Sequence, residues 1–258
     1  SEIFGALGFL SKIDFYKKVE NLTEHFLTPK ILVRYAPGSM RKETNNSKLG
    51  TSKAFELNKI NSTNNFETGL SATMGFDYEI RDNNRKIGLS MSQVLNQKEN
   101  KNMPTSMGLD EKLSDLMGAA SYEITDKLNL SYNFAIDQNY EEFNYNEISA
   151  KTNFDKLNFN VSYLEENKHI GENEYIKSKI EYNLAKDTNL SYEFKRNLIT
   201  DSSEFYNLSY EYFNDCLRAG LVYRREFYND SEIEAENSLM FKITLTPFGD
   251  INSPKIYK

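Results

Sequence analysis

The sequence predicts an all-β protein, specifically an antiparallel transmembrane β-barrel of the outer-membrane type. The main observation is that apolar and polar residues alternate in one short segment after another between residues 66 and 248. Such alternation places the apolar side chains on one face of a strand and the polar side chains on the other. Strands of about ten residues with one apolar and one hydrated face are typical of outer-membrane barrels.

The strands are expected to begin near residues 3, 27, 66, 85, 112, 127, 143, 156, 174, 187, 204, 216 and 238. Alternation is clearest in residues 127–137, 157–163 and 239–246. This gives about 13 strands, whereas single-chain bacterial barrels have an even number. No signal peptide precedes the first alternating stretch, although a membrane barrel must be exported. Both observations favour a fragment, the C-terminal portion of a larger barrel.

The predicted connections fall into two classes. Short polar turns are expected at 125–127, 153–156, 186–188 and 214–215, and longer ones at 97–111, 138–142, 167–173, 199–203 and 228–237. Outer-membrane barrels have short turns in the periplasm and long loops outside the cell. Residues 37–65 form a further long polar loop with an expected ordered piece near Ala54–Leu57, and loops of this length are usually functional or mobile.

Composition excludes some functions. The chain has 258 residues, 39% of them hydrophobic, and no apolar run long enough for a membrane helix. Its mean hydropathy of -0.65 does not argue against a barrel, because barrel strands expose half their residues to water. The net charge of -7 argues against a nucleic-acid partner. His25 and His169 lie far apart, and no catalytic, phosphate-binding or metal-binding motif is present, so we expect no enzyme, cofactor or metal.

Cys216 is the only cysteine and lies in a predicted periplasmic turn, Phe213–Leu217. A lone cysteine in an exported protein indicates a disulfide partner elsewhere or a free thiol. A buried structural cysteine is the alternative interpretation.

Four segments resemble the lipopolysaccharide-assembly outer-membrane protein, the LptD family: residues 27–37, 67–75, 210–228 and 238–249. The most specific part runs from Cys216 to Phe248 and Gly249. The family barrel has about twice the predicted number of strands and follows an N-terminal periplasmic domain. The resemblance therefore implies that residues 1–258 are the C-terminal half of the barrel domain, and that the periplasmic domain and the first strands lie outside this chain.

The resemblance also implies a function in the Gram-negative envelope. The family receives lipopolysaccharide from a periplasmic bridge protein and inserts it into the outer leaflet, through the barrel lumen and a lateral seam between strands. The last predicted strand would be one side of that seam, where a weakly paired edge can open. Its expected residues are Leu239, Phe241, Ile243, Leu245 and Pro247.

Two further partners follow from the resemblance. Cys216 matches a family cysteine that forms an interdomain disulfide with the periplasmic domain, although some relatives carry an adjacent pair there. An outer-membrane lipoprotein that plugs the family's lumen has no identifiable footprint in this sequence.

Three other functions stay open from the residues alone. A general porin or substrate-specific channel would share the alternation and the turns. A secreted β-sheet adhesin or solenoid would stay folded without detergent, and an outer-membrane hydrolase is the remaining alternative. A half-barrel expressed alone would leave two strand edges unpaired in lipid, so we expect it to aggregate or to stay unfolded.

Overall fold

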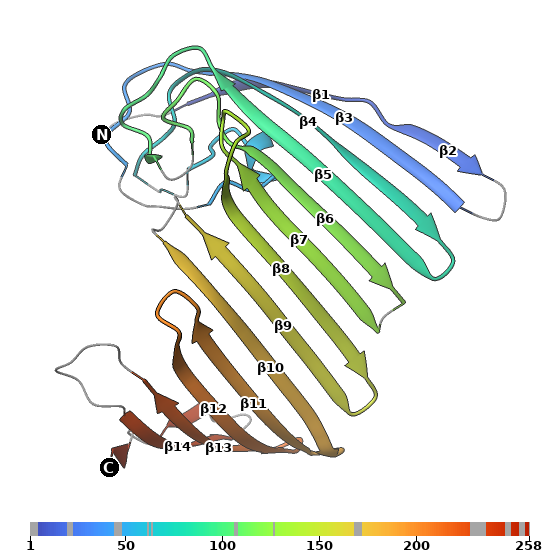
Figure 1. Ribbon diagram of the computed structural model, residues 1–258, viewed down its shortest axis with the longest axis vertical. Coiled ribbons are helices and arrows are strands. Elements are labelled where there is room, and N and C mark those ends of the chain that lie inside the picture. The colour runs from blue at the N-terminus through green and yellow to red at the C-terminus, as the bar shows by residue number, and fades with distance from the viewer. Residues whose placement is uncertain are drawn as a thin grey trace. The chain divides into compact units, whose positions relative to one another are not determined.

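The computed structural model describes residues 5–19, 23–43, 48–60, 62, 64–105, 108–125, 127–167, 172–227, 236–245, 249–252 and 256–257. Figure 1 shows the strands within these ranges. The first are β1 (Leu7–Lys12), β2 (Phe15–Val19), β3 (Thr23–Ala36), β4 (Gly69–Asp82), β5 (Arg85–Asn96), β6 (Leu116–Ile124), β7 (Leu128–Ile136) and β8 (Phe143–Phe154). They are followed by β9 (Leu157–Glu166), β10 (Asn173–Ala185), β11 (Thr188–Asn197), β12 (Ser202–Phe213), β13 (Leu217–Glu226), β14 (Glu236–Leu245), β15 (Gly249–Asn252) and β16 (Ile256–Tyr257). The described ranges contain no helix with the length and apolar content needed to cross a membrane.

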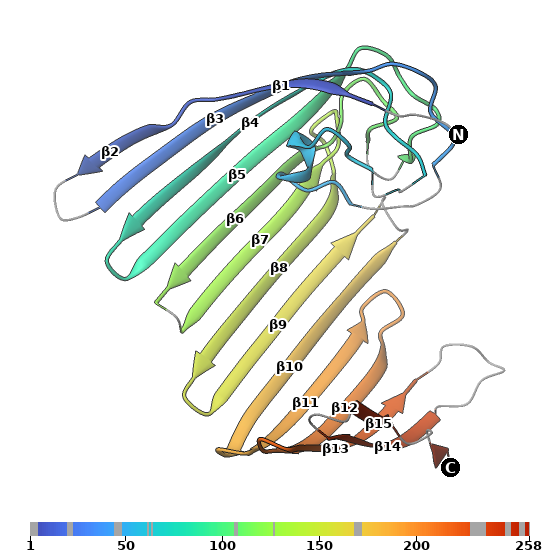
Figure 2. The same cartoon turned by 180° about the vertical axis from the view of Figure 1, so that it is seen from behind.

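The strands form an antiparallel meander in which sequence neighbours pair from β3 to β15 (Figures 1 and 2). The predicted all-β antiparallel fold is therefore confirmed, and the predicted strand starts from residue 66 to residue 238 each lie within four residues of an observed one. Two predictions were wrong. The first stretch forms two strands, β1 and β2, and β14 is not the last strand, because β15 and β16 follow and pair with it.

The division of the first stretch has a local cause. Both β1 and β2 pair with the same long strand β3, and the ladder is interrupted between them opposite Pro29. The Ile13 N–H donates to the Pro29 carbonyl at 3.2 Å, but proline has no N–H to donate in return. The sheet edge therefore breaks where one ladder donor is missing.

Short and long connections alternate along the chain, as predicted. Two residues join β4 to β5, β8 to β9, and β10 to β11, whereas residues 37–68 join β3 to β4 and residues 97–115 join β5 to β6. The long connection 37–68 contains a 3-10 turn, η1 (Lys53–Phe55), close to the predicted ordered piece.

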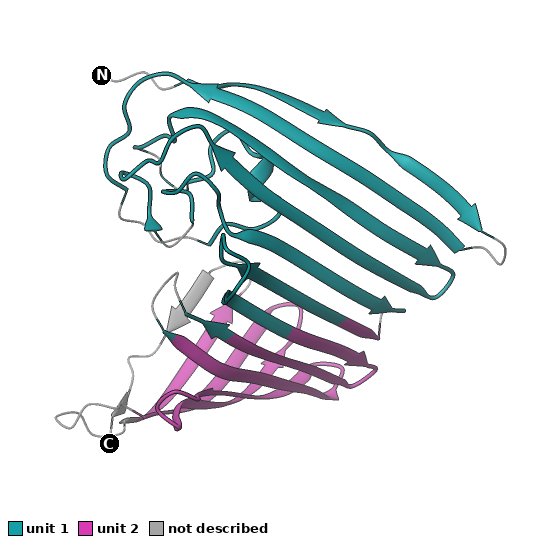
Figure 3. Ribbon diagram, turned by 45° about the horizontal axis from the view of Figure 1, so that its top comes forward, with its two compact units in different colours: residues 1–125, 130–148, 165–172 teal, residues 126–129, 149–164, 173–258 magenta. Residues whose placement is uncertain are grey.

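The chain divides into two compact units, each described by itself (Figure 3). Unit 1 comprises residues 1–125, 130–148 and 165–172, and unit 2 comprises residues 126–129, 149–164 and 173–258. Unit 1 thus contains β1–β6 and the long connections 37–68 and 97–115. Unit 2 contains β10–β16.

The sheet of unit 2 has two chemically different faces because apolar and polar residues alternate along its strands and the register aligns them. One face carries cross-strand apolar rows, and we call it the apolar face. Two of its rows are Tyr182–Leu190–Tyr210–Leu221–Phe241 and Ile180–Tyr192–Leu208–Tyr223–Leu239. The opposite, polar face carries rows such as Lys179–Glu193–Asn207–Arg224–Ser238. Most of the apolar-row side chains are exposed, which is the arrangement expected of a lipid-facing surface.

In unit 1 one face of the sheet is covered by the chain itself. The connections 37–68 and 97–115 gather beside the same ends of β3–β5 (Figures 1 and 2). Their apolar side chains form a buried cluster with residues of β5 and β6, which we call the loop core: Met40, Leu49, Ala54, Ile60, Val94, Met103, Leu109 and Met117. The other face of β3 exposes Ile31, Val33 and Tyr35.

Candidate functional site

The polar face of unit 2 is lined by alternating charges. Lys177 pairs with Glu193 at 2.8 Å, Lys179 with Glu181 at 2.5 Å, and Lys195 with Glu204 at 2.7 Å. All of these side chains keep at least a fifth of their surface exposed, so the ion pairs are hydrated and contribute little stability. Such a face suits contact with water and with polar solutes.

A shallow groove of about 270 Å³ lies on unit 2 at β8–β10. Its lining is mostly amide and charged: Lys151, Asn153, Asn158, Phe159, Asn160, Lys179 and Glu181. Amide groups both donate and accept hydrogen bonds, and the lysines add positive charge. The groove can therefore bind groups that carry many hydroxyls or a negative charge, such as those of acidic saccharides.

The segment 48–60 of unit 1 lies directly on strands β1, β3 and β4. Gly8 and Gly75 make room for it: a Cβ at Gly8 would meet Leu57 Cδ2 at 2.5 Å, and one at Gly75 would meet Phe55 Cζ at 3.1 Å. The Thr73 hydroxyl donates to the carbonyl of Ala54 at 2.9 Å, and both residues are buried. The absence of a side chain at two strand positions thus lets this segment pack closely against the sheet.

A charge cluster fixes the segment 48–68 to β3. The Lys59 Nζ donates to the two carboxylate oxygens of Glu67 at 3.1 and 3.3 Å, and Arg34 Nη1 lies 3.1 Å from Glu67 Oε1. Arg34 Nη2 also donates to the Glu67 carbonyl at 2.7 Å. All three side chains are at least 95% buried. We refer to Arg34, Lys59 and Glu67 as the charge cluster.

The charge cluster is electrostatically unequal, because two cations share one carboxylate. Burial lowers the pKa of Lys59 below its usual value, Glu67 opposes this shift, and the positive charge of Arg34 adds to it. Arg34 Nε, which is buried, has no hydrogen-bond partner among the described residues. The cluster therefore depends on Glu67, whose removal would leave two buried positive charges.

A second polar group surrounds Lys48, at the other end of the same segment. Its Nζ lies 3.4 Å from the ring centroid of Tyr145 and 3.7 Å from Glu147 Oε2. The same carboxylate oxygen accepts hydrogen bonds from the Tyr145 hydroxyl at 2.6 Å and from Asn133 at 3.3 Å. Burial lowers the pKa of Lys48, and Glu147 opposes that shift. Lys48, Asn133 and Tyr145 line a cavity of about 240 Å³ together with Leu49 and Met117.

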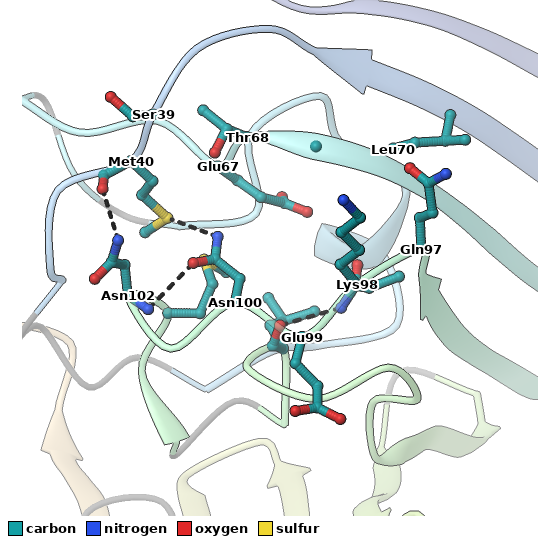
Figure 4. Close-up of a pocket in the computed structure, with 14 residues that line it drawn as sticks. Ser39, Met40, Glu67, Thr68, Leu70, Gln97, Lys98, Glu99, Asn100 and Asn102 are labelled. Atoms are coloured by element: carbon teal, nitrogen blue, oxygen red, sulfur yellow. Dashed lines mark hydrogen bonds between the residues drawn. The ribbon is translucent and has the colours of Figure 1, made fainter.

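A further cavity of about 270 Å³ lies between the two long connections of unit 1 (Figure 4). Asn102 donates to the Met40 carbonyl at 2.9 Å and Asn100 contacts the Met40 sulfur at 3.5 Å, so these side chains hold the two connections together. Gln97, Lys98 and Glu99 also line this cavity, as does Glu67 of the charge cluster.

Cys216 lies in the turn between β12 and β13, as predicted, and its side chain is exposed, with no second cysteine in these 258 residues. The alternative of a buried structural cysteine is therefore wrong. The side chain of Asn214 organises the turn, because its Oδ1 accepts the N–H groups of Cys216 at 2.9 Å and Leu217 at 2.8 Å. With both backbone donors bound, the thiol is left facing solvent.

The predicted seam residues lie on β14. Leu239, Phe241 and Leu245 are exposed and Ile243 is half-buried, all on the apolar face, while Pro247 lies outside the described residues. β13 pairs with β14 along its whole length. On the other edge of β14, β15 pairs with Lys242–Leu245 and β16 with Ser238 and Leu239.

The histidines do not come together in a described site. His25 Nδ1 lies 2.8 Å from the Tyr78 hydroxyl, a strand-to-strand contact, and His169 lies outside the described residues. The described ranges contain no group of three or more histidine, cysteine or acidic residues arranged to hold a metal ion.

Sequence reasoning did not identify Arg34, Lys59 and Glu67. The sequence of β3 did hold an indication, because apolar residues stand at both odd and even positions. Ile31, Val33 and Tyr35 point to one face of the strand, and Leu32 and Ala36 to the other. A barrel strand has one lipid-facing apolar side and one polar side, so apolar residues on both sides indicate that the chain itself covers the second side. The buried side chains of Leu32, Arg34 and Ala36 lie under that cover.

Three comparisons with known proteins place these features in context. The family model described as "LptD: LPS transport system D" matches residues 5–238. A search of curated protein sequences found no match. Two engineered variants of the Rhodopseudomonas blastica porin are similar in structure, each with a TM-score of 0.43 and 10% identity over 97% of this chain and 93% of the porin. Scores of this size do not support a conclusion about this chain.

Proposed function

The chain belongs to the LptD family of lipopolysaccharide transport proteins of the outer membrane, and on that premise we propose that it forms part of the translocon itself. It receives lipopolysaccharide from a periplasmic bridge protein and inserts it into the outer leaflet. The polar part of the lipid travels along the lumen, and the acyl chains leave through a lateral seam. The chain supplies the C-terminal half of the barrel domain, performs no catalysis and needs no cofactor.

The two-faced sheet of unit 2 is the observation that carries this proposal. Lipopolysaccharide joins a hydrophilic saccharide to acyl chains, so a route for it needs a hydrated surface beside an apolar one. The polar face offers exposed charges and the groove lined by Asn158, Asn160 and Lys151. The apolar face offers continuous rows ending at Leu239 and Phe241.

We place the seam at β14, beside its edge with β15 and β16. β13 holds the whole of Glu236–Leu245, whereas the opposite edge is divided between two short strands. A ladder divided into short pieces opens at a lower free-energy cost than a continuous one. Pro247 follows this edge in the sequence and has no N–H to donate to a ladder.

Cys216 is proposed to form a disulfide with a cysteine of the periplasmic domain. This proposal is supported by the exposure of the thiol, which lies in a short turn of the kind that faces the periplasm and is therefore accessible to a second cysteine. The remaining proposed partner is an outer-membrane lipoprotein that occupies the lumen.

Site-specific photocrosslinking in the complete protein tests the proposal. A photoreactive residue replaces either Asn207, on the polar face, or its neighbour Leu208, on the apolar face. We expect the saccharide of lipopolysaccharide to be captured at position 207 during transport, and position 208 to capture acyl chains or nothing. If position 207 captures no lipopolysaccharide in cells that are delivering lipopolysaccharide to the outer leaflet, the proposed route is wrong. A general porin is then the better interpretation of this chain.

A further inference from the structure

The apolar face of unit 2 changes its chemistry at one end. The two rows that end at Leu239 and Phe241 contain only apolar and tyrosine side chains. The next row toward the longer connections of unit 2, residues 198–201 and 227–235, is Ser178–Phe194–Tyr206–Arg225–Asn237, followed by Ile176–Arg196–Ser203. In the described rows, guanidinium groups therefore appear on this face only after the apolar rows, at the end of unit 2 that bears these longer connections.

Aromatic rings lie around one of these two arginines, Arg225. Tyr206 stacks on Tyr192 with ring centroids 6.2 Å apart, and Phe227 meets Tyr206 edge-on at 5.4 Å. The Arg225 guanidinium lies 4.8 Å from the centroid of the Phe227 ring. Arginine over an aromatic ring keeps its hydrogen-bond donors available at the edge of the guanidinium plane.

The charge balance leaves Arg225 available. Arg196 donates to Asp201 at 2.5 Å, and Glu174, the other carboxylate at this end of β10, accepts from the Tyr163 hydroxyl at 2.9 Å. Arg225 is exposed and forms no ion pair with any described residue. Among the described residues, an anionic group that reached this surface would thus meet the Arg225 guanidinium without a competing carboxylate, and Arg196 paired with an exposed one.

The depth of the two arginines fits a membrane boundary. From Thr188 to Arg196 the strand advances eight residues, or about 27 Å, which is about 20 Å along the membrane normal at a strand tilt of about 40°. The apolar band of an outer-membrane barrel is about 25 Å tall. Arg196 therefore lies toward the far boundary of a band of this height when Thr188 lies at the near one, and Arg225 lies one row closer to the apolar rows.

We propose that Arg196 and Arg225, with Tyr206 and Phe227, form a binding surface for the phosphorylated headgroup of an outer-leaflet glycolipid. This inference rests on the proposed function, which places the long connections outside the cell. The surface adjoins the proposed seam, because Arg225 lies opposite Asn237 of β14. A lipid that leaves at β14 would thus meet a phosphate-binding surface one strand away, and its acyl chains would lie on the apolar rows.

Lipid binding to the complete protein, measured by native mass spectrometry, tests this surface. The probes are bisphosphorylated lipid A, the same lipid without phosphates, and inorganic phosphate. The test variant is Arg196→Gln with Arg225→Gln. The matched control is Arg218→Gln, an exposed arginine on the same strand as Arg225 but at its short-turn end.

We expect the double variant to bind bisphosphorylated lipid A about 25-fold more weakly, since each arginine at a membrane surface contributes about fivefold. Arg218→Gln should bind like the wild type, and the lipid without phosphates should bind all three proteins equally. Equal binding of the phosphorylated lipid by the double variant and the control would overturn the proposal. Displacement of that lipid by inorganic phosphate alone would also overturn it, because the site would then be a simple anion site.

Crosslinking at position 207 separates this inference from the proposed function. If the double variant loses lipid A binding but still captures lipopolysaccharide at position 207, both stand. If wild-type protein captures lipopolysaccharide there and yet shows no phosphate-dependent lipid binding, the surface is wrong and the transport route stands. If position 207 captures nothing, the transport route fails.

Discussion

Lys59 donates hydrogen bonds to both carboxylate oxygens of Glu67, at 3.1 and 3.3 Å, and neither side chain is accessible to solvent by more than a twentieth of its surface. The same carboxylate is paired with Arg34 of β3. The connection 37–68 is thereby attached to the sheet through one acidic residue. Several testable consequences come from that arrangement and from the faces of the sheet.

Glu67→Gln and Lys59→Met should have opposite consequences. Glu67→Gln leaves two buried cations without a counter-charge, so we expect anchoring of the connection to weaken by roughly 3–5 kcal/mol. Lys59→Met removes the surplus charge and leaves Arg34 paired with Glu67, so the change should be near zero or stabilising. Limited proteolysis of segment 48–68 in the folded, complete protein measures both effects. Similar protease sensitivity in the two variants would contradict the role of charge balance.

Anchoring should also depend on pH through Lys59. Burial lowers the pKa of Lys59 from its usual value of 10.5, so between the lowered pKa and 10.5 a released segment binds more protons than an anchored one. The free energy of release therefore rises with pH across that window, and the full cost of burying the ammonium applies below it. Pulse proteolysis of wild type and Lys59→Met across this range, taken as a ratio, removes the protease's own pH dependence. A constant ratio would exclude the coupling.

Gly75→Ala should destabilise the pairing of β4 with β5, whereas Gly220→Ala should leave the stability of its sheet unchanged. A Cβ at Gly75 would lie 2.2 Å from the backbone oxygen of Met91, which cannot move without shifting β5. At Gly220 the nearest atom is Glu211 Cγ at 3.5 Å, an ordinary contact. We expect a loss of about 1–3 kcal/mol for Gly75→Ala and less than about 0.5 kcal/mol for Gly220→Ala. Urea unfolding in lipid vesicles measures the difference, and equal stability would show that β4 relaxes freely.

Leu208→Arg and Asn207→Arg place the same charge on opposite faces of β12. Leu208 lies on the apolar face, so its replacement should cost about 2–4 kcal/mol if that face contacts the centre of the membrane. Asn207 lies on the polar face beside Glu193, where an arginine stays hydrated and the cost should be near zero. Folding into vesicles followed by urea unfolding tests this pair. The reverse order of stabilities would mean that the assigned faces are exchanged.

Cys216→Ser tests the proposed disulfide. On a non-reducing gel of outer membranes, we expect the mobility of the wild-type band to change with reductant and that of the variant to be unaffected, because only a closed disulfide loop restricts the denatured chain. Maleimide labelling before reduction is the control, since an exposed free thiol reacts and a disulfide does not. Full labelling of the wild type would rule out the disulfide.

Local patterns predicted most of the strands. Alternation in segments such as Leu128–Ile136 is a property of the backbone, since period two decides which side chains share a face regardless of what covers it. The turn at Cys216 was predicted for the same kind of reason, because the residues of Asn214–Leu217 interact mainly with each other.

The charge cluster could not be predicted in this way. Arg34 and Glu67 lie 33 residues apart, and their pairing depends on how the connection 37–68 folds onto the sheet. That packing requires the space left by Gly8 and Gly75, which the sequence shows only as two glycines in strands. The pairing of β15 and β16 with β14 likewise depends on register and not on alternation.

The sequence by itself determined the all-β architecture, the position of nearly every strand and the alternation of short and long connections, because these depend on residues close together in the chain. The resemblance of its segments to a family determined the expected function. Only the tertiary structure decided that the two long connections form a buried core, that Lys59 and Arg34 share Glu67, and that Arg196 and Arg225 end the apolar face. These relationships join residues of different strands, and they are set by register and packing, which no local pattern encodes.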